Sequence, residues 1–369
     1  MPVISVHGYN LAVKFLSAPT VAILLSLCAV AQAAGAPRTG AFVTSFTETT
    51  PLADHDEVLR RLLHPIVYQQ WQAEGRAKTG QTIDPRSETW KVYVPPDYDG
   101  SVPYGVFVWV DWSQDGRVYG DWDHVLREHK LIYVGADRSG NDESVVERRV
   151  PLALTGLANI EAAYNVDKSR VYIAGFSGGG VTASRIAAAY ADIFTGGLFV
   201  STSDALGGND VPVPPLDRFS LMRSRGRYVF TSGDEETTNL VMNVRTVASY
   251  RDLCVLRVDF IHIPNATHGN LESRTFARAL NYLDDPPAPE AQAEADCEKK
   301  LAARREAGID AVRQALAEGD RDKAWGLLQD LSVAFGPLAE PEFSQYAACL
   351  NGAASGACPA VLGNPPGTR

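Results

Sequence analysis

Short apolar runs alternate with helix-compatible segments between residues 89 and 283 of this 369-residue chain. Several of the runs are apolar throughout, which is typical of central strands that helices cover on both faces. The alternation predicts a mostly parallel sheet in one α/β domain over residues 89–285. The expected strands are Thr89–Val94, Val106–Val110, Leu131–Val134, Arg170–Ala174, Leu198–Val200, Tyr228–Phe230 and Val258–Ile263, and the expected helices are Asp121–Glu128, Ser144–Tyr164, Thr182–Tyr190, Val241–Tyr250 and Leu271–Leu283.

An uncharged apolar stretch at residues 15–31 follows Lys14 and leads into small residues, with Ala31 and Ala33 forming an A-x-A site. This pattern is typical of a secretory signal peptide. We therefore expect removal of residues 1–33 and a secreted or periplasmic mature chain without a membrane span. A retained N-terminal anchor is the alternative.

Five cysteines become four when Cys28 is removed with the signal peptide, and an even count fits an oxidising compartment. Cys349 and Cys358 would close a short Gly/Ala-rich loop, so we favour that pair. By elimination Cys254 pairs with Cys297. The alternative is four reduced or buried thiols.

Two further regions flank the predicted sheet. Residues 34–88 form an N-terminal extension, in which apolar positions at helical spacing predict one helix over Asp54–Glu74. A proline-rich stretch at 285–290 marks the other boundary. Beyond it, Ala291–Leu316 and Lys323–Leu331 predict a helical hairpin within an appendage over residues 291–369. We expect this appendage to pack on the body; a docking module for a protein partner is the alternative.

Ser177 stands in a G-x-S-x-G sequence that follows the strand Arg170–Ala174 and precedes the helix Thr182–Tyr190. A strand, this turn and a helix in that order form the context that a nucleophile elbow requires. Gly175 and Gly179 allow the strand and the helix to approach closely. The sequence therefore predicts Ser177 as a nucleophile at a helix N-terminus.

A serine hydroxyl needs a base, and a base needs a carboxylate to orient it. His262 and His268 are the histidines after Ser177, and His268 is favoured because it stands in the loop after the last strand. The loop after Tyr228–Phe230 offers the acid. The usual spacing from a glycine selects Glu236, with Asp234 as the alternative.

The oxyanion of a serine-catalysed acyl transfer needs two backbone amides. One would be the amide of Gly178. The second should come from the loop after Val106–Val110, where Trp112 or Ser113 can provide it.

The formal net charge of −10 offers no basic stripe, which argues against sequence-independent nucleic-acid binding as a function. The seven histidines are scattered, and neither C-x-x-C nor H-E-x-x-H occurs. We therefore predict no metal site, and serine chemistry requires no cofactor.

These residues resemble a known group of enzymes. Thr89–Leu283 resembles the α/β-hydrolase superfamily, and within it secreted esterases related to polyhydroxybutyrate depolymerases, feruloyl esterases and dienelactone hydrolases. Val92–Tyr98 is similar to the first strand of those esterases, and Tyr164–Tyr172 to the lead-in before their elbow. Many relatives carry His-Gly where this chain has Asp111 and Trp112, a departure that concerns the shape of the loop and the acyl pocket.

The expectation is an exported serine hydrolase that uses a Ser-acid-His triad and an acyl-enzyme. The resemblance implies an α/β-hydrolase fold, with helices on both faces of the sheet, and a small-molecule or polymer ester as substrate. A serine peptidase of the same fold is one alternative. A noncatalytic exported binding or scaffold protein is the other.

Overall fold

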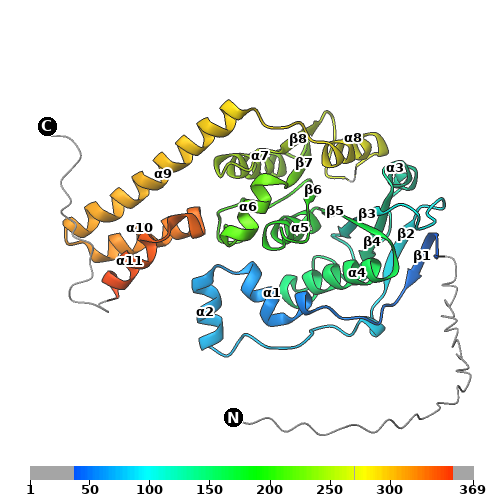
Figure 1. The fold of residues 1–369 in the computed structure, drawn as a ribbon, viewed down its shortest axis with the longest axis horizontal. Coiled ribbons are helices and arrows are strands. Elements are labelled where there is room, and N and C mark those ends of the chain that lie inside the picture. The colour runs from blue at the N-terminus through cyan, green and yellow to red at the C-terminus, as the bar shows by residue number, and fades with distance from the viewer. Residues whose placement is uncertain (1–36, 270, 352–369) are drawn as a thin grey trace, which may run out of the picture. The chain divides into compact units, whose positions relative to one another are not determined.

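An eight-stranded sheet organises the computed structural model, which describes residues 37–269 and 271–351 (Figure 1). The strand order is β1-β2-β4-β3-β5-β6-β7-β8, in which β2 is antiparallel to β1 and β4 and all other neighbours are parallel. The mostly parallel sheet is therefore confirmed. The strands are β1 (Gly40–Thr44), β2 (Trp90–Val94), β3 (Tyr104–Val110), β4 (Leu131–Ala136), β5 (Val166–Phe176), β6 (Gly196–Val200), β7 (Arg227–Gly233) and β8 (Val258–Ile263).

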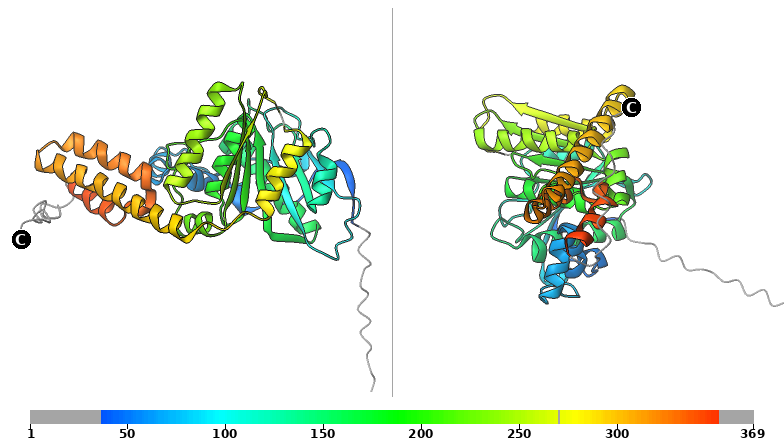
Figure 2. Two further views of the ribbon diagram at one scale, coloured as in Figure 1. Left: turned by 90° about the horizontal axis from the view of Figure 1, so that it is seen from above. Right: turned by 90° about the vertical axis from the view of Figure 1, so that its left-hand side faces the viewer.

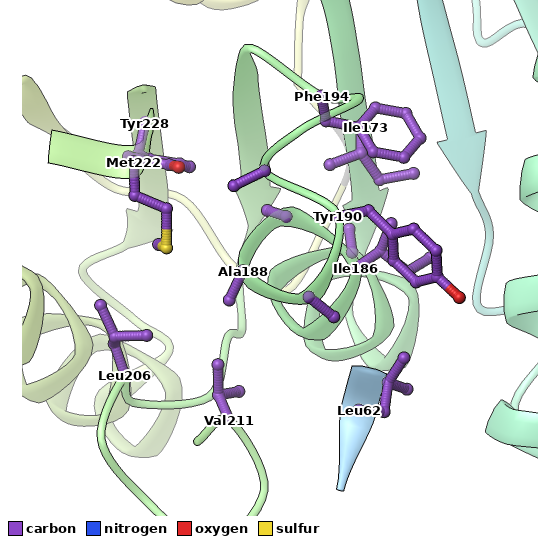
Figure 3. Close-up of a cluster of buried hydrophobic side chains, with 14 of the residues drawn as sticks. Leu62, Ile173, Ile186, Ala188, Tyr190, Phe194, Leu206, Val211, Met222 and Tyr228 are labelled. Carbon is purple, nitrogen blue, oxygen red and sulfur yellow. The ribbon is translucent and has the colours of Figure 1, made fainter. Parts of the chain in front are cut away.

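Helices cover both faces of the sheet, as predicted, and each face has its own buried apolar cluster. One cluster holds Trp122 of α3 stacked on Phe276 of α8, with ring centroids 4.1 Å apart. The other includes Ile173 of β5 and Ile186 of α5 (Figure 3). The helices of the body are α3 (Trp122–Glu128), α4 (Val150–Ala163), α5 (Gly178–Ala189), α6 (Leu216–Ser224), α7 (Thr237–Asp252) and α8 (Ser273–Asp284), and η3 (Val145–Arg149) is a π-helical turn before α4.

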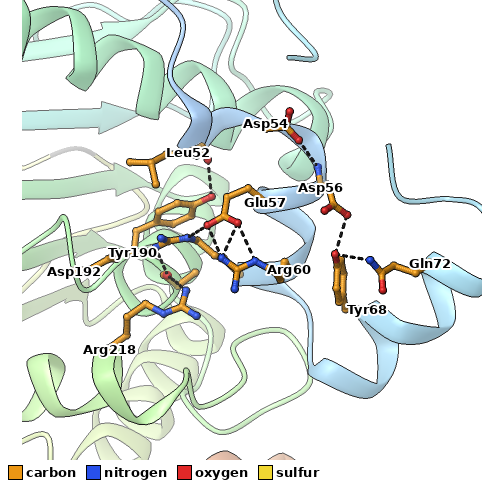
Figure 4. Close-up of polar contacts among 12 residues, drawn as sticks. Leu52, Asp54, Asp56, Glu57, Arg60, Tyr68, Gln72, Tyr190, Asp192 and Arg218 are labelled. Atoms are coloured by element: carbon orange, nitrogen blue, oxygen red, sulfur yellow. Dashed lines mark hydrogen bonds and ion pairs between the residues drawn. The ribbon is translucent and has the colours of Figure 1, made fainter. Parts of the chain in front are cut away.

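The N-terminal extension differs from its prediction. The expected single helix over Asp54–Glu74 is wrong: α1 (His55–Leu62) and α2 (Pro65–Ala73) are separate helices. Pro65 explains the break, because proline disfavours a helical residue before it and lacks an N–H for the helix. On α1, Arg61 pairs with Glu57 and Asp192 and so joins this helix to the body (Figure 4).

Several other elements were not predicted. The strand β1 lies within a stretch up to Thr50 that reads as polar, and its alternating burial marks an edge strand with one covered face. The helix α6 and the short turns between elements were also missed. The short turns are η1 (Pro51–Ala53), η2 (Pro85–Ser87) and η4 (Gly336–Ala339).

The C-terminal helices are present. The predicted hairpin consists of α9 (Ala291–Ala317) and α10 (Arg321–Phe335), which lie side by side in Figures 1 and 2, and α11 (Glu342–Leu350) follows. The predicted disulfide Cys254–Cys297 is confirmed and links α9 to the loop after α7. The pairing of Cys349 with Cys358 and the signal peptide fall outside the described residues. Within the described ranges, no helix is both long and apolar enough to cross a membrane.

Candidate active site

Ser177 stands in a sharp turn between β5 and α5. Its φ of 56° is uncommon for a residue with a side chain and indicates local backbone strain. The turn needs glycine on both sides: a Cβ on Gly179 would lie 2.0 Å from the carbonyl oxygen of Val110, and a Cβ on Gly175 would lie 2.3 Å from that of Gly179. The amide of Ser177 donates to the Val200 carbonyl on β6, which anchors the turn.

His268 lies in the loop that follows β8 and faces this serine. Its Nε2 is 2.9 Å from the Ser177 Oγ, and Phe176 packs beside its ring with centroids 4.9 Å apart. His262, by contrast, is an exposed residue of β8. The structure therefore brings together the serine and the histidine that the sequence favoured.

The loop after β7 brings Glu236, and not Asp234, to the histidine. A carboxylate oxygen of Glu236 lies 2.5 Å from His268 Nδ1. Asp234 is exposed, and its carboxylate makes no hydrogen bond or ion pair to the described residues. The geometry thus favours Glu236 over Asp234, the alternative that the sequence left open, as the acid beside His268.

Three more donors hold the Glu236 carboxylate. Oε1 accepts from the Ser201 hydroxyl at 3.0 Å and from the Gly233 amide at 3.1 Å, and Oε2 accepts from Asn239 Nδ2 at 2.9 Å. Burial alone would raise the pKa of Glu236, but the hydrogen bonds from Asn239, His268, Gly233 and Ser201 outweigh it. They hold the pKa below its usual 4.5, so the carboxylate is charged at neutral pH.

Sequence reasoning missed Ser201 and Asn239. Asn239 lies in the first turn of α7, three residues after Glu236, and its spacing alone was a usable signal. Ser201 follows β6 with a φ of 69°, and nothing near it in the sequence announces its contact with an acid 35 residues later.

Two unpaired amides are available for the oxyanion that was predicted here. The amide of Gly178 is the first in α5 and has no intrahelical partner. The Trp112 amide donates no hydrogen bond to the described residues, whereas the Ser113 amide donates to Asp111 Oδ1 at 2.8 Å. Of the two residues that the sequence offered in this loop, Trp112 therefore has the free donor.

The loop that carries Trp112 lies against the elbow. A Cβ on Gly179 would be 3.1 Å from the carbonyl carbon of Asp111, which is bonded to the Trp112 nitrogen. The indole of Trp112 is 48% exposed, so the side chain is not part of the core.

The strand order, the serine elbow after β5 and the chain order Ser177, Glu236, His268 together decide the fold. The chain has the α/β-hydrolase fold. No family model matches it, and no curated protein matches it.

Solved structures of the α/β-hydrolase type are similar to this chain at low identity. S-formylglutathione hydrolase from Staphylococcus aureus is 14% identical, with 54% of this chain and 93% of that chain covered and a TM-score of 0.42. A ferulic acid esterase is 16% identical, with 65% and 95% covered and a TM-score of 0.43. A poly(3-hydroxybutyrate) depolymerase from Bordetella parapertussis is 17% identical, with 57% and 88% covered and a TM-score of 0.40. At this level of similarity, their substrates do not transfer to this chain.

Metal-ligating side chains do not gather anywhere in the described ranges: no group of three or more His, Cys, Asp or Glu residues could hold a metal ion there.

Proposed function

We propose that this protein is an exported serine hydrolase that cleaves carboxylic esters, with Ser177, His268 and Glu236 as its triad. One observation carries the proposal: the hydrogen bonds run without a break from the Ser177 hydroxyl through the imidazole to a buried carboxylate, over 2.9 Å and 2.5 Å. A serine in a strained elbow with this partner set can act as a nucleophile.

The reaction would proceed through an acyl-enzyme. The Oγ of Ser177 attacks the ester carbonyl while Nε2 of His268 takes its proton. The imidazolium then returns that proton to the leaving alcohol, and water repeats the sequence to release the acid. Glu236 keeps the Nδ1 proton in place and stabilises the transient positive charge. The amides of Gly178 and Trp112 donate to the oxyanion of each tetrahedral intermediate.

An ester substrate is proposed over a peptide because Val92–Tyr98 and Tyr164–Tyr172 resemble segments of secreted esterases; the triad chemistry itself permits both. Export is proposed from the N-terminal sequence, and the disulfide Cys254–Cys297 is consistent with an oxidising compartment. The substrate would be a small-molecule or polymer ester.

Covalent labelling with a fluorophosphonate probe tests the proposal. We expect the wild type to label at one site and Ser177→Ala to lose the label. Ser224→Ala is the matched control, because the one hydrogen bond of the Ser224 hydroxyl to the described residues is to the Ser220 carbonyl on α6. An unlabelled wild type, or equal labelling of Ser177→Ala, would refute the hydrolase and leave a noncatalytic binding protein.

Hydrolysis of a substrate panel then assigns the bond. Short-chain nitrophenyl, feruloyl and hydroxybutyrate esters are compared with peptide p-nitroanilides, each with Ser177→Ala as background. Turnover of the anilides without turnover of any ester would refute the esterase and support the peptidase.

A further inference from the structure

Two adjacent arginines in the π-helical turn η3 have different surroundings. Arg148 is partly exposed and makes a bidentate ion pair with Glu88, over 3.0 Å and 2.7 Å. Arg149, the last residue of the turn, is only 3% exposed and has no carboxylate within 4.0 Å among the described residues. A buried guanidinium without an ion-pair partner is costly and needs an explanation.

The guanidinium of Arg149 donates to backbone carbonyls in three separate segments. Its Nη2 lies 2.9 Å from the carbonyl oxygen of Asp111, its Nη1 lies 3.2 Å from that of Gly178, and its Nε lies 2.9 Å from that of Ser139. These segments are the loop after β3, the nucleophile elbow and the loop after β4. One planar group therefore fixes the distance between the two loops that carry the free amides.

The contact with Asp111 reaches the second amide directly. The carbonyl of Asp111 and the N–H of Trp112 belong to the same planar peptide group, in which the C=O and the N–H point in opposite directions. When Arg149 holds that carbonyl, the Trp112 N–H must point away from the guanidinium. A donor bound to the carbonyl also polarises the peptide and strengthens its N–H as a donor.

Arg149 keeps its positive charge in this position. Burial lowers its pKa to about 10, and the nearby Asp111 carboxylate opposes that effect. The group is therefore protonated at neutral pH. Its charge lies behind the Asp111–Trp112 peptide, whose N–H would donate to the developing oxyanion, and its positive sign favours that negative charge.

We propose that Arg149 is a positioning residue that sets the oxyanion hole, by holding the Asp111–Trp112 peptide and the elbow at Gly178 in a fixed relation. The inference rests on the proposed hydrolase function. It requires the fork of the guanidinium, because a lysine ammonium in the same place cannot reach three carbonyls in a plane.

The test compares Arg149→Met and Arg149→Lys with the matched pair Arg218→Met and Arg218→Lys. Arg218 on α6 (Figure 4) is also buried. Its Nη1 donates at 2.7 Å to the carbonyl of Ala189, which ends α5 at the opposite end from the elbow. Active sites are counted by fluorophosphonate labelling carried to completion. The kcat and KM for p-nitrophenyl acetate are then expressed per labelled site, and the inhibition constant of a small alkylboronic acid is measured.

Loss of one oxyanion donor in a serine hydrolase costs roughly 100- to 1,000-fold in kcat. We expect Arg149→Met to lose about 100-fold in kcat per labelled site at little changed KM, with boronate inhibition weakened by a similar factor. Arg149→Lys should lose at least about 10-fold. The Arg218 variants should keep wild-type kcat per labelled site even where they unfold more easily. Comparing kcat per labelled site with the number of labelled sites distinguishes the two roles of Arg149. A residue that only stabilises the fold would, when replaced, lower the number of labelled sites and leave kcat per site unchanged.

Wild-type kcat per labelled site in Arg149→Met would overturn the inference and leave the hydrolase proposal intact. If Arg149→Met does not fold, Arg149→Lys decides, because wild-type kcat in that variant also overturns the inference. A wild type that neither labels nor hydrolyses the ester would refute the proposed function itself, and the role of Arg149 with it.

Discussion

Replacing Glu236 by glutamine is the sharpest test of the triad, because the change is nearly isosteric and turns one acceptor into a donor. In the structure each carboxylate oxygen has two partners. Oε1 faces the Gly233 amide and the Ser201 hydroxyl, and Oε2 faces Asn239 Nδ2 and His268 Nδ1. The new NH₂ must face one of these two pairs.

The partners decide its orientation. An NH₂ in the Oε1 position would meet the Gly233 N–H, which is fixed by the backbone and would be left unsatisfied at a cost of about 1–3 kcal/mol. An NH₂ in the Oε2 position meets groups that can adapt, because the Asn239 amide can rotate and His268 can move its proton. The second orientation is therefore favoured, and it leaves the proton on Nε2, the nitrogen that must accept from Ser177.

The expected loss follows from this tautomer. A preference of about 1–3 kcal/mol leaves the productive form as a minor population, a reduction of roughly 5- to 150-fold. The neutral amide also no longer stabilises the imidazolium. Together we expect kcat to fall by about 1,000- to 10,000-fold, which is about 4–5.5 kcal/mol in activation free energy and in line with an amide in place of the acid of a Ser-His-Asp triad.

The assay is p-nitrophenyl acetate hydrolysis per fluorophosphonate-labelled site, with Asp234→Asn as the matched control. Asp234 has the same chemistry two residues away but is exposed, and its carboxylate contacts no partner among the described residues. That control should stay within about 2-fold of wild type, as expected for a surface substitution. The reasoning would be refuted if Glu236→Gln kept more than a tenth of the wild-type kcat. It would also be refuted if Asp234→Asn lost more kcat than Glu236→Gln.

Three further predictions concern stability. Replacing both Cys254 and Cys297 by alanine opens a loop of 43 residues and should lower the free energy of unfolding by about 4 kcal/mol; an unchanged urea midpoint would contradict this. Gly179→Ala places a Cβ 2.0 Å from the Val110 carbonyl oxygen and should cost about 3 kcal/mol, seen as a lower Tm and weak labelling. At Asp284, burial opposes ionisation, but His129, Arg170 and Tyr172 hold the pKa of its carboxyl below 3.8. The charged carboxylate therefore stabilises the fold, and Asp284→Asn should lower the free energy of unfolding at pH 7. Because the folded pKa is the lower one, that deficit should shrink as pH falls through it, and urea unfolding at pH 7 and pH 3 measures the difference.

The sequence predicts Ser177 and His268 because their signals are local. The elbow needs small residues at fixed offsets, and the base needs a loop after the last strand, so both requirements are visible within a few residues. The acid is different. Asp234 and Glu236 share a loop. They differ in the hydrogen-bond donors around the Glu236 carboxylate, one of which, Ser201, comes from the end of another strand.

Prediction of the elements fails where one residue overrides a regular pattern. The apolar spacing from Asp54 to Glu74 continues across Pro65, so periodicity alone joins two helices that proline separates. The turn η3 is a similar case. Helical spacing covers Ser144–Tyr164 as one helix, but the π-helical turn sends Arg148 to the surface and Arg149 inward. An arginine pair on a continuous helix reads as a solvated face, which hides the buried member.

The unusual loop after β3 and the buried Arg149 explain each other. Where relatives are expected to carry His-Gly, this chain has Asp111 and Trp112, so glycine flexibility is not available to shape the loop. Asp111 is instead held from both sides. Its carboxylate accepts from the Trp109 indole at 2.8 Å and from the Ser113 amide at 2.8 Å, while its carbonyl accepts from Arg149. The carboxylate bond occupies the Ser113 amide and the carbonyl bond orients the Trp112 amide, so the same residue leaves Trp112, and not Ser113, with the free N–H. Long-range contacts thus shape this loop where local glycines would otherwise shape it. Because such contacts are not visible in the sequence, the sequence alone left Trp112 and Ser113 as alternatives for the second oxyanion amide.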